Sequence, residues 1–415
     1  MNITKMKIFY VIVFFILYIQ NSNSIDFNYL SAFNFGDSNS DTGDLVAGLG
    51  IRLDLPYGQN SFKTSSQRFC DGRLLIDFLR DSNSDTGNLI SAGIETVNPP
   101  YGQTYFNLPS GRYCDGRLIV DFLLDAMDMP FLNPYLDSLG LPNFKKGCNF
   151  AAAGSTILPA NPTSVSPFSF DLQISQFIRF KTRSLELLSK TGGVDLKILG
   201  RRYEKYLPPL DYYSKGLYMI DIGQNDIAGA FYSKSLDQVL ASIPSILETF
   251  ELGLKRLYEE GGRNFWIHNS GPLGCLAQNI AKFGTDPTKL DEFGCVSSHN
   301  QAAKLFNLQL HALSNKFQAQ FPDSNVTYVD IFSIKSNLIA NYSRFGFENP
   351  LMACCGVGGA PLNYDSRITC GQTKVIDGIS VTAKACNDSS EYINWDGIHY
   401  TEAANHFVSS QILTG

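Results

Sequence analysis

Four apolar runs rich in β-forming residues constrain the fold of this chain more than any other feature of its sequence. They span residues 31–36, 216–223, 264–271 and 326–332, and runs of this kind are typical of strands buried on both faces. Amphipathic patterns that predict helices lie at residues 171–190, 235–258 and 298–321, and a last helix is expected from Thr401 onward. Because strands that alternate with helices form parallel sheets, we predict one α/β domain around a mainly parallel sheet.

Polar motifs follow the first two of these runs. Gly36-Asp37-Ser38 comes after the first run, and Gly223-Gln224-Asn225-Asp226 comes after the second. Since parallel sheets bind ligands at the carboxyl ends of their strands, we expect both motifs at one site. No linker rich in Pro, Gly or Ser divides the chain, so residues 25–415 are predicted to form a single domain.

A tandem repeat begins within the first motif. The heptapeptide Asp-Ser-Asn-Ser-Asp-Thr-Gly occurs twice, and the duplicated segments that it opens span residues 37–79 and 81–123. Each copy also contains the tetrapeptide Cys-Asp-Gly-Arg. A misjoined gene model is the alternative origin of this duplication.

The repeat leaves two candidate nucleophiles, Ser38 and Ser82. Ser38 follows a strand-like run and Gly36, whereas Ser82 follows Leu79, Arg80 and Asp81. Glycine tolerates a sharp turn after a strand, and arginine has a Cβ atom that disfavours one. We therefore predict that Ser38 is the working serine. The alternative structural interpretation of the heptapeptide is a Ser/Asx turn that caps a helix.

The amino terminus is typical of a secretory signal peptide. Lys5 and Lys7 precede an apolar run at residues 8–19, and a short polar stretch ends at Ser24, so residues 1–24 are predicted to be removed on export. The run is too short for a membrane span, and we expect a secreted protein without a stable membrane anchor. Three sequons predict glycosylation at Asn325, Asn341 and Asn387.

The cysteines agree with an oxidising compartment. There are nine, an odd number, but Cys70 and Cys114 are the same position in the two copies, so one copy accounts for the surplus thiol. We predict a Cys275–Cys295 disulfide. We also expect pairing within a disulfide-tied surface segment at residues 352–387, among four further cysteines: Cys354, Cys355, Cys370 and Cys386.

The overall composition argues against a polyanionic partner. The net charge is −6, and the 33 basic residues form no basic tract, so nucleic-acid binding is not expected. Apolar residues make up 44% of the chain, which is enough for a large core.

Four further residues fit the chemistry of serine hydrolysis, which needs a base, a carboxylate that orients it and donors for an oxyanion. Among only five histidines, His399 differs because Asp396 precedes it by three residues in a loop-like motif. The other four lie in helical or strand-like patterns and are expected to pack or to face solvent. Asn225 and Gly154 are candidate oxyanion donors, although Asn225 also fits a simple turn and Gly154 a loop of small packing residues.

The order of these motifs along the chain resembles that of the GDSL (SGNH) hydrolase family. Four segments are closest to its plant secreted esterase/lipase branch: Phe35-Gly36-Asp37-Ser38-Asn39-Ser40-Asp41-Thr42-Gly43, Asn149-Phe150-Ala151, Gly271-Pro272-Leu273-Gly274-Cys275 and Trp395-Asp396-Gly397-Ile398-His399-Tyr400-Thr401-Glu402. The resemblance covers nearly the whole mature chain apart from one repeat copy, since family members that resemble this chain have the first block once.

The resemblance implies a three-layer α/β/α fold and a secreted ester hydrolase. It assigns Ser38, Asp396 and His399 to a catalytic triad that acts through an acyl-enzyme, and it assigns the oxyanion hole to the Ser38 N–H, Gly154 and Asn225. It implies no metal or organic cofactor. The expected partner is a small-molecule ester of a lipid, an acetylated sugar or an acetylated metabolite, and the protein is expected to be a monomer. The alternative is an inactive pseudohydrolase that binds an acylated or glycosylated ligand in the same cleft.

Overall fold

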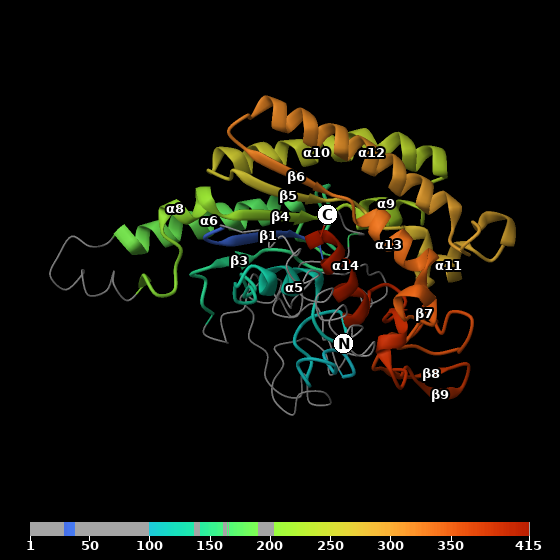
Figure 1. Ribbon diagram of the computed structural model, residues 1–415. Helices are drawn as coiled ribbons and strands as arrows, with labels where there is room; N and C mark the ends of the chain where they lie inside the picture. The colour runs from blue at the N-terminus through green and yellow to red at the C-terminus, as the bar shows by residue number, and fades with distance from the viewer. Residues whose placement is uncertain are drawn as a thin grey trace, which may run out of the picture.

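A five-stranded parallel sheet forms the centre of the molecule (Figure 1). The computed structural model describes residues 29–37, 99–136, 142–160, 164, 166–189 and 203–414. The strand order is β3-β1-β4-β5-β6. The strands are β1 (Ala32–Gly36), β3 (Gly147–Asn149), β4 (Leu217–Asp221), β5 (Asn264–His268) and β6 (Asn325–Val329).

The four strands predicted from apolar runs are confirmed as β1, β4, β5 and β6, and β3 was not predicted. This strand has only three residues, Gly-Cys-Asn, so its sequence contains no apolar run. It exists because its backbone pairs with β1, with Gly147 opposite Ala32. Pairing of that kind depends on a strand more than a hundred residues away and leaves no local signal.

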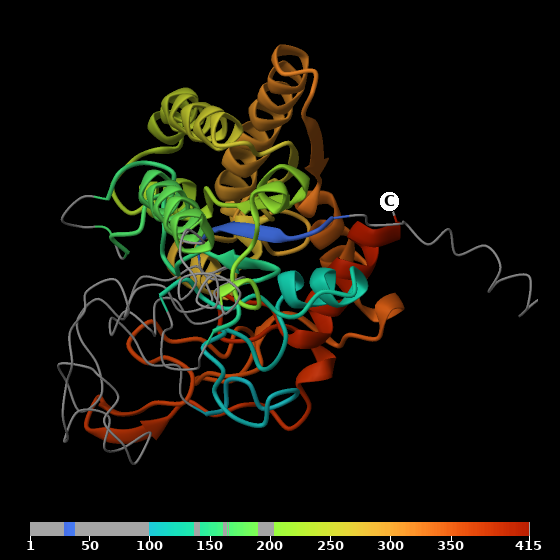
Figure 2. The same ribbon diagram turned by 90° about the vertical axis from the view of Figure 1, so that its left-hand side faces the viewer.

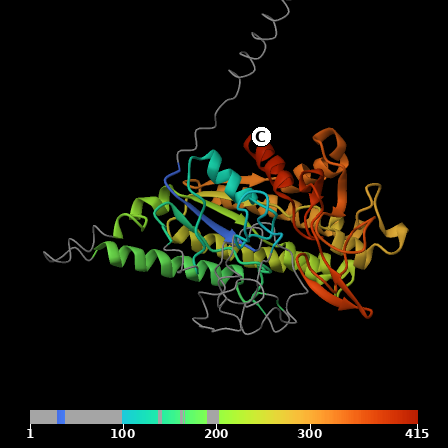
Figure 3. The same ribbon diagram turned by 90° about the horizontal axis from the view of Figure 1, so that it is seen from below.

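Helices cover both faces of the sheet. One face is covered by α6 (Phe170–Ser189), α10 (Leu236–Glu259) and α12 (Ser297–Gln320). On the other face, α5 (Ile119–Ala126) packs against α14 (Glu402–Thr414). Figures 2 and 3 show the two layers on opposite sides of the blue strand β1. The predicted three-layer α/β/α fold is confirmed, as are the four predicted helices.

The remaining elements are short. Four helices connect the strands or follow them: α8 (Leu210–Lys215), α9 (Gln224–Ala230), α11 (Ala277–Phe283) and α13 (Ile331–Ala340). Two small sheets lie outside the central one, β7 (Asn349–Ala353) with β10 (Tyr392–Asn394), and β8 (Thr373–Ile376) with β9 (Ile379–Thr382). Within the described ranges, no helix has the length and apolar character needed to cross a membrane.

Helix α10 was predicted correctly because two sequence signals specify it. Ser235 caps the amino terminus by accepting a hydrogen bond from the Gln238 backbone N–H, and the Gln238 side chain returns one to the Ser235 backbone. Residues at helical spacing along the same helix, including Ile243, Phe250 and Leu254, are buried. Capping and an apolar stripe therefore specify the same element.

Strand β1 lies in the middle of the core. Phe33 and Phe35 point to one face of the sheet, where their ring centroids lie 5.3 and 5.6 Å from that of Phe177 on α6. On the other face, the buried Asn34 amide donates to Asn149 Oδ1 over 2.8 Å. Burial of each phenylalanine contributes about 1.5–3 kcal/mol, so this strand is a main determinant of stability.

The described core combines residues from both sides of the first repeat copy. Strand β1 precedes residue 37, whereas the second copy contains the buried residues Cys114 and Leu118 and the start of α5. Asp115, in the Cys-Asp-Gly-Arg motif of this copy, accepts hydrogen bonds from Ser389 Oγ and from the Glu402 backbone N–H at 2.6 Å each. The second copy thereby fixes the start of α14.

The predicted Cys275–Cys295 disulfide is confirmed. The four cysteines expected to pair with one another do so as Cys354–Cys386 and Cys355–Cys370. These two bonds close the segment that contains the exposed β8–β9 hairpin, which agrees with a disulfide-tied surface segment.

Candidate active site

The two polar motifs that follow β1 and β4 meet at the carboxyl edge of the sheet. Asp37 directly follows β1 and is fully buried, and Asn225 lies in the first turn of α9. The Asn225 amide donates to Asp37 Oδ2 over 3.3 Å and to the Ser155 carbonyl over 3.0 Å. Segments around residues 37, 155 and 225 are thus joined by one side chain, as expected for a parallel sheet.

Gly154 lies beside this amide in the loop after β3. Its φ is +70°, a conformation that favours glycine over other residues. The next residue, Ser155, closes the turn by donating its N–H to the Ala152 carbonyl over 3.2 Å. Gly154 is buried, and among the described residues its own N–H has no hydrogen-bond acceptor. A backbone donor of this kind is available to an oxyanion.

Asp226 connects the Gly154 loop to helix α9. Its two carboxylate oxygens accept hydrogen bonds from the backbone N–H groups of Ile157 and Leu158, at 2.8 and 3.0 Å. Burial raises the pKa of this carboxyl to about 7, although the two backbone donors oppose the rise. The sequence pattern did not single out this residue as a support for its neighbour Asn225.

Gly36 lies at the end of β1 and contacts helix α6. It is the last paired residue of β1, opposite Asp221, and the turn predicted after it leads to residues outside the described part of the chain. Its N–H donates to Gln173 Oε1 over 2.8 Å, and its carbonyl accepts from the Gln173 amide. Gln173, on α6, therefore holds the end of β1 in place, directly before Asp37.

Asp396 and His399 form a buried pair in one turn of chain. His399 Nδ1 is hydrogen-bonded to Asp396 Oδ2, and Asp396 Oδ1 accepts from the Ile398 and His399 backbone N–H groups at 3.0 and 2.9 Å. Gly397 makes the turn possible. Its φ is +100°, and an added Cβ would lie 2.1 Å from the Tyr364 ring.

Two tyrosines that the sequence pattern did not reveal surround this pair. The Tyr101 hydroxyl donates to Asp396 Oδ2 over 2.6 Å, and the Tyr113 ring centroid lies 5.2 Å from that of His399. Both tyrosines share an apolar cluster with Trp395 and with Ala152 and Ala153, which adjoin Gly154. The Asp396–His399 loop and the Gly154 loop therefore belong to one packed unit.

The surroundings of Asp396 keep it ionised. Burial on its own raises the pKa of this carboxyl, but the positive charge of His399 and the hydrogen bonds from His399 and Tyr101 outweigh it, so the net shift is downward. A carboxylate bonded to Nδ1 directs the other ring nitrogen, Nε2, toward the reacting group.

Three histidines illustrate why His399 is distinct. His268 is buried at the end of β5, and His299 is buried in α12, where its ring stacks on Phe231 at 3.9 Å. His406 lies on α14 against Phe122. Their packing agrees with the expectation from the sequence. Ser38 and Ser82 both lie outside the described residues.

A model of the GDSL-like lipase/acylhydrolase family matches residues 81–412 of this chain. The chain belongs to this family. Its relatives include GDSL esterase/lipase At1g54790 of Arabidopsis thaliana, which is 76% identical over all of this chain and 95% of its own length. GDSL esterase/lipase At3g05180, from the same plant, is 51% identical over 96% of this chain and 91% of its own length.

This membership makes the chain a hydrolase that acts on ester bonds. It does not favour the alternative of an inactive pseudohydrolase. The family match begins at Asp81, in the second repeat copy, because that copy continues without interruption into the rest of the domain. Strand β1, however, precedes the first copy, and Asp37 directly follows it.

Proposed function

We propose that this protein is a secreted serine esterase that uses Ser38, His399 and Asp396 and forms an acyl-enzyme. The observation that supports the proposal best is the buried Asp396–His399 pair, because the carboxylate accepts hydrogen bonds from the imidazole, the Tyr101 hydroxyl and two backbone N–H groups. Such a carboxylate fixes the tautomer of the base and stabilises the imidazolium that forms during reaction.

In the first half-reaction, Ser38 Oγ attacks the ester carbonyl carbon while His399 Nε2 removes the hydroxyl proton. The tetrahedral oxyanion collapses, and His399 gives the proton to the departing alkoxide, which leaves as the alcohol. In the second half-reaction, His399 activates a water that attacks the acyl-serine, and the carboxylic acid leaves as the proton returns to Ser38.

The proposed oxyanion donors are the N–H groups of Ser38 and Gly154 and the side-chain amide of Asn225. The Gly154 loop and the Asn225 helix are tied together by Asp226, so two of these donors are held in a fixed relation. The Asn225 amide donates to Asp37 over 3.3 Å, and we propose that it exchanges this long bond for the oxyanion.

Ser38 is proposed over Ser82 because it directly follows Asp37, whose side chain meets Asn225. The test is a pair of substitutions assayed on p-nitrophenyl acetate. Ser38→Ala should reduce kcat by at least about a thousandfold, since loss of a nucleophile leaves only oxyanion stabilisation and binding. Ser82→Ala should stay within about twofold of the unmodified enzyme. Loss of activity only with Ser82→Ala would reverse the assignment.

We also propose that residues 1–24 are a signal peptide, that the protein is a glycosylated monomer, and that residues 25–415 form its single domain. The three sequon asparagines, Asn325, Asn341 and Asn387, are exposed, and three disulfides lie among the described residues. Mass spectrometry of protein from a secreting plant cell culture, before and after enzymatic deglycosylation, tests the leader and each sequon. Light scattering tests the monomer.

A further inference from the structure

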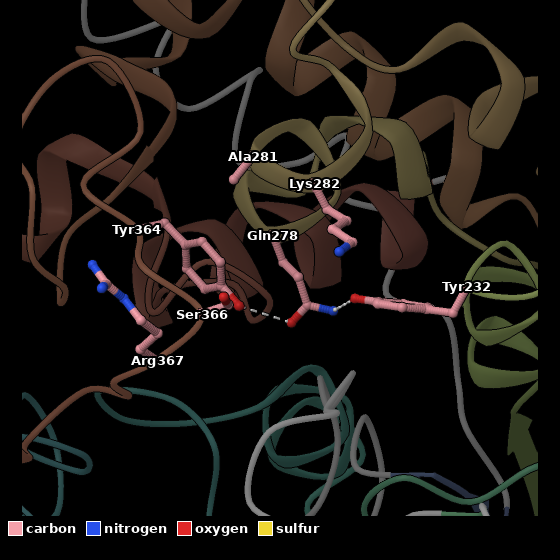
Figure 4. A pocket seen from close by; sticks show the side chains of 7 residues that line it. All are labelled: Tyr232, Gln278, Ala281, Lys282, Tyr364, Ser366 and Arg367. Carbon is pink, nitrogen blue, oxygen red and sulfur yellow. Dashed lines mark hydrogen bonds between the residues drawn. The ribbon is translucent and has the colours of Figure 1, made fainter. Parts of the chain in front are cut away.

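A cavity of about 460 Å³ lies next to the Asp396–His399 loop. Its walls come from three segments: Tyr232 just after α9, residues of α11 around Gln278, and the segment from Tyr364 to Arg367. Figure 4 shows Tyr364, Gln278 and Tyr232 in a row, with Lys282 beside the amide. Nothing in the catalytic proposal uses these residues.

Two contacts join this cavity to the catalytic turn. The Gln278 backbone N–H donates to the Gly397 carbonyl over 3.0 Å. The Tyr364 ring lies so close to Gly397 that an added Cβ would clash with it at 2.1 Å. Gly397 separates Asp396 from Ile398 and His399, so one wall of the cavity is in direct contact with the catalytic turn.

The lining suits a polyhydroxylated ring better than an acyl chain. Ala281 is its only aliphatic residue, and the other six side chains end in a hydroxyl, an amide or a cation. An acyl chain would leave those polar groups without water, which is unfavourable. Two tyrosines offer aromatic faces for a sugar ring, as aromatic side chains combine an apolar face with a polar tip.

The polar groups of the cavity are already oriented. The Tyr364 hydroxyl donates to Gln278 Oε1 over 3.1 Å, and Gln278 Nε2 donates to the Tyr232 hydroxyl over 3.4 Å (Figure 4). This leaves the Tyr232 O–H proton and one amide N–H of Gln278 for a ligand. The charge of Arg367 is offset by Asp365 and Asp377, at 2.7 and 3.0 Å, so Lys282 is the cation best suited to bind a ligand oxygen.

We propose that this cavity binds the sugar ring of an O-acylated carbohydrate, with the ring against Tyr232 and Tyr364 and its hydroxyls on Gln278 and Lys282. The inference rests on the proposed esterase function and adds the class of alcohol that the enzyme releases. It makes the cavity the subsite for the leaving alcohol.

The test compares an acetylated xylotetraose with ethyl acetate, which has the same acyl group and no sugar. The measured quantity is the ratio of the two kcat/KM values. Tyr232→Ala should lower this ratio about tenfold, and Lys282→Gln about threefold. Lys234→Gln, which alters an exposed lysine outside the cavity, should leave the ratio unchanged. Thermal unfolding of each variant checks that the fold is retained.

Binding of unacetylated xylotetraose, measured by calorimetry on the unmodified enzyme and on Tyr232→Ala, separates this inference from the proposed function. If the enzyme hydrolyses ethyl acetate but Tyr232→Ala changes neither the ratio of the kcat/KM values nor the affinity for xylotetraose, the sugar subsite is overturned. Faster hydrolysis of long-chain esters, with their KM raised by Tyr232→Ala, would assign the cavity to an acyl chain. If Tyr232→Ala loses sugar binding and neither the unmodified protein nor any variant hydrolyses an ester, the result counts against the esterase proposal alone.

Discussion

At the scale of single residues, the site depends on how a buried carboxylate is kept ionised. Asp396 is 9% exposed, and burial alone would favour its neutral form. His399 and the Tyr101 hydroxyl reverse that preference by interacting with the same oxygen, Oδ2. Tyr101 is therefore a positioning residue that acts through Asp396. Its hydrogen bond to a charged acceptor belongs to the strong class.

Replacing Tyr101 with Phe removes this hydrogen bond and keeps the ring against Tyr113 and Trp395. The pKa of Asp396 should rise, so the acidic limb of the kcat/KM profile should move to higher pH, and kcat/KM at neutral pH should fall about tenfold. The matched control is Tyr105→Phe, at an exposed tyrosine of the same segment. An equal loss at every pH, with the acidic limb unmoved, would show that Tyr101 does not act through the ionisation of Asp396.

At the scale of elements, the Gly154 loop and helix α9 are joined by two side chains of the helix, the Asn225 amide and the Asp226 carboxylate. The two oxygens of the carboxylate satisfy two consecutive backbone N–H groups, at Ile157 and Leu158. Buried N–H groups without acceptors are costly, so this carboxylate defines the path of the loop after Gly154.

The raised pKa of Asp226, about 7, makes this link dependent on pH. In the unfolded chain an aspartate titrates near 3.9, so the folded state holds the extra proton between about pH 4 and 7. Protonation of Asp226 in the folded state therefore stabilises the protein fully below about pH 4. This stabilisation, at most about 4 kcal/mol, is lost as the pH rises through 7. Asp226→Asn should therefore show a weaker decline in melting temperature from pH 5 to pH 8 than the unmodified protein. Parallel declines would assign the pH dependence to other groups.

At the scale of the whole molecule, the fold uses strand β1 from before the first repeat copy and helix α5, which begins in the second copy. The two copies are offset by 44 residues, from Asp37 to Asp81. Excision of residues 37–80 joins Gly36 to Asp81 and restores one continuous motif. It keeps β1, α5 and every buried apolar residue of the described core, and Asp81 takes the position of the buried Asp37.

We expect the protein without residues 37–80 to fold, with a melting temperature within about 3 °C of the parent and with esterase activity retained through the serine at position 82. The opposite excision, of residues 81–124, joins Arg80 to Asp125 and places an arginine where Leu124 is fully buried. Loss of that leucine and burial of an unpaired charge should cost more than about 3 kcal/mol. Circular dichroism melts of both proteins test the prediction, and greater stability of the second would refute it.

The sequence by itself determined the parallel sheet, its layers and the family. Long apolar runs and amphipathic helices leave local signals, so β1, β4, β5, β6 and the main helices could be predicted. The same holds for Asp396 and His399, because their contact spans three residues. The disulfide pairing within 352–387 was expected only as a set, since connectivity depends on which sulfurs the fold brings together.

The tertiary structure decided the contacts between residues that are distant in sequence. Strand β3 is set by pairing with β1, the Gly36 strand end by Gln173, and the ionisation of Asp396 partly by Tyr101, which is 295 residues away along the chain. Neither a three-residue strand nor a single tyrosine has a periodic or local signature. Their roles follow from packing, which only the folded chain defines.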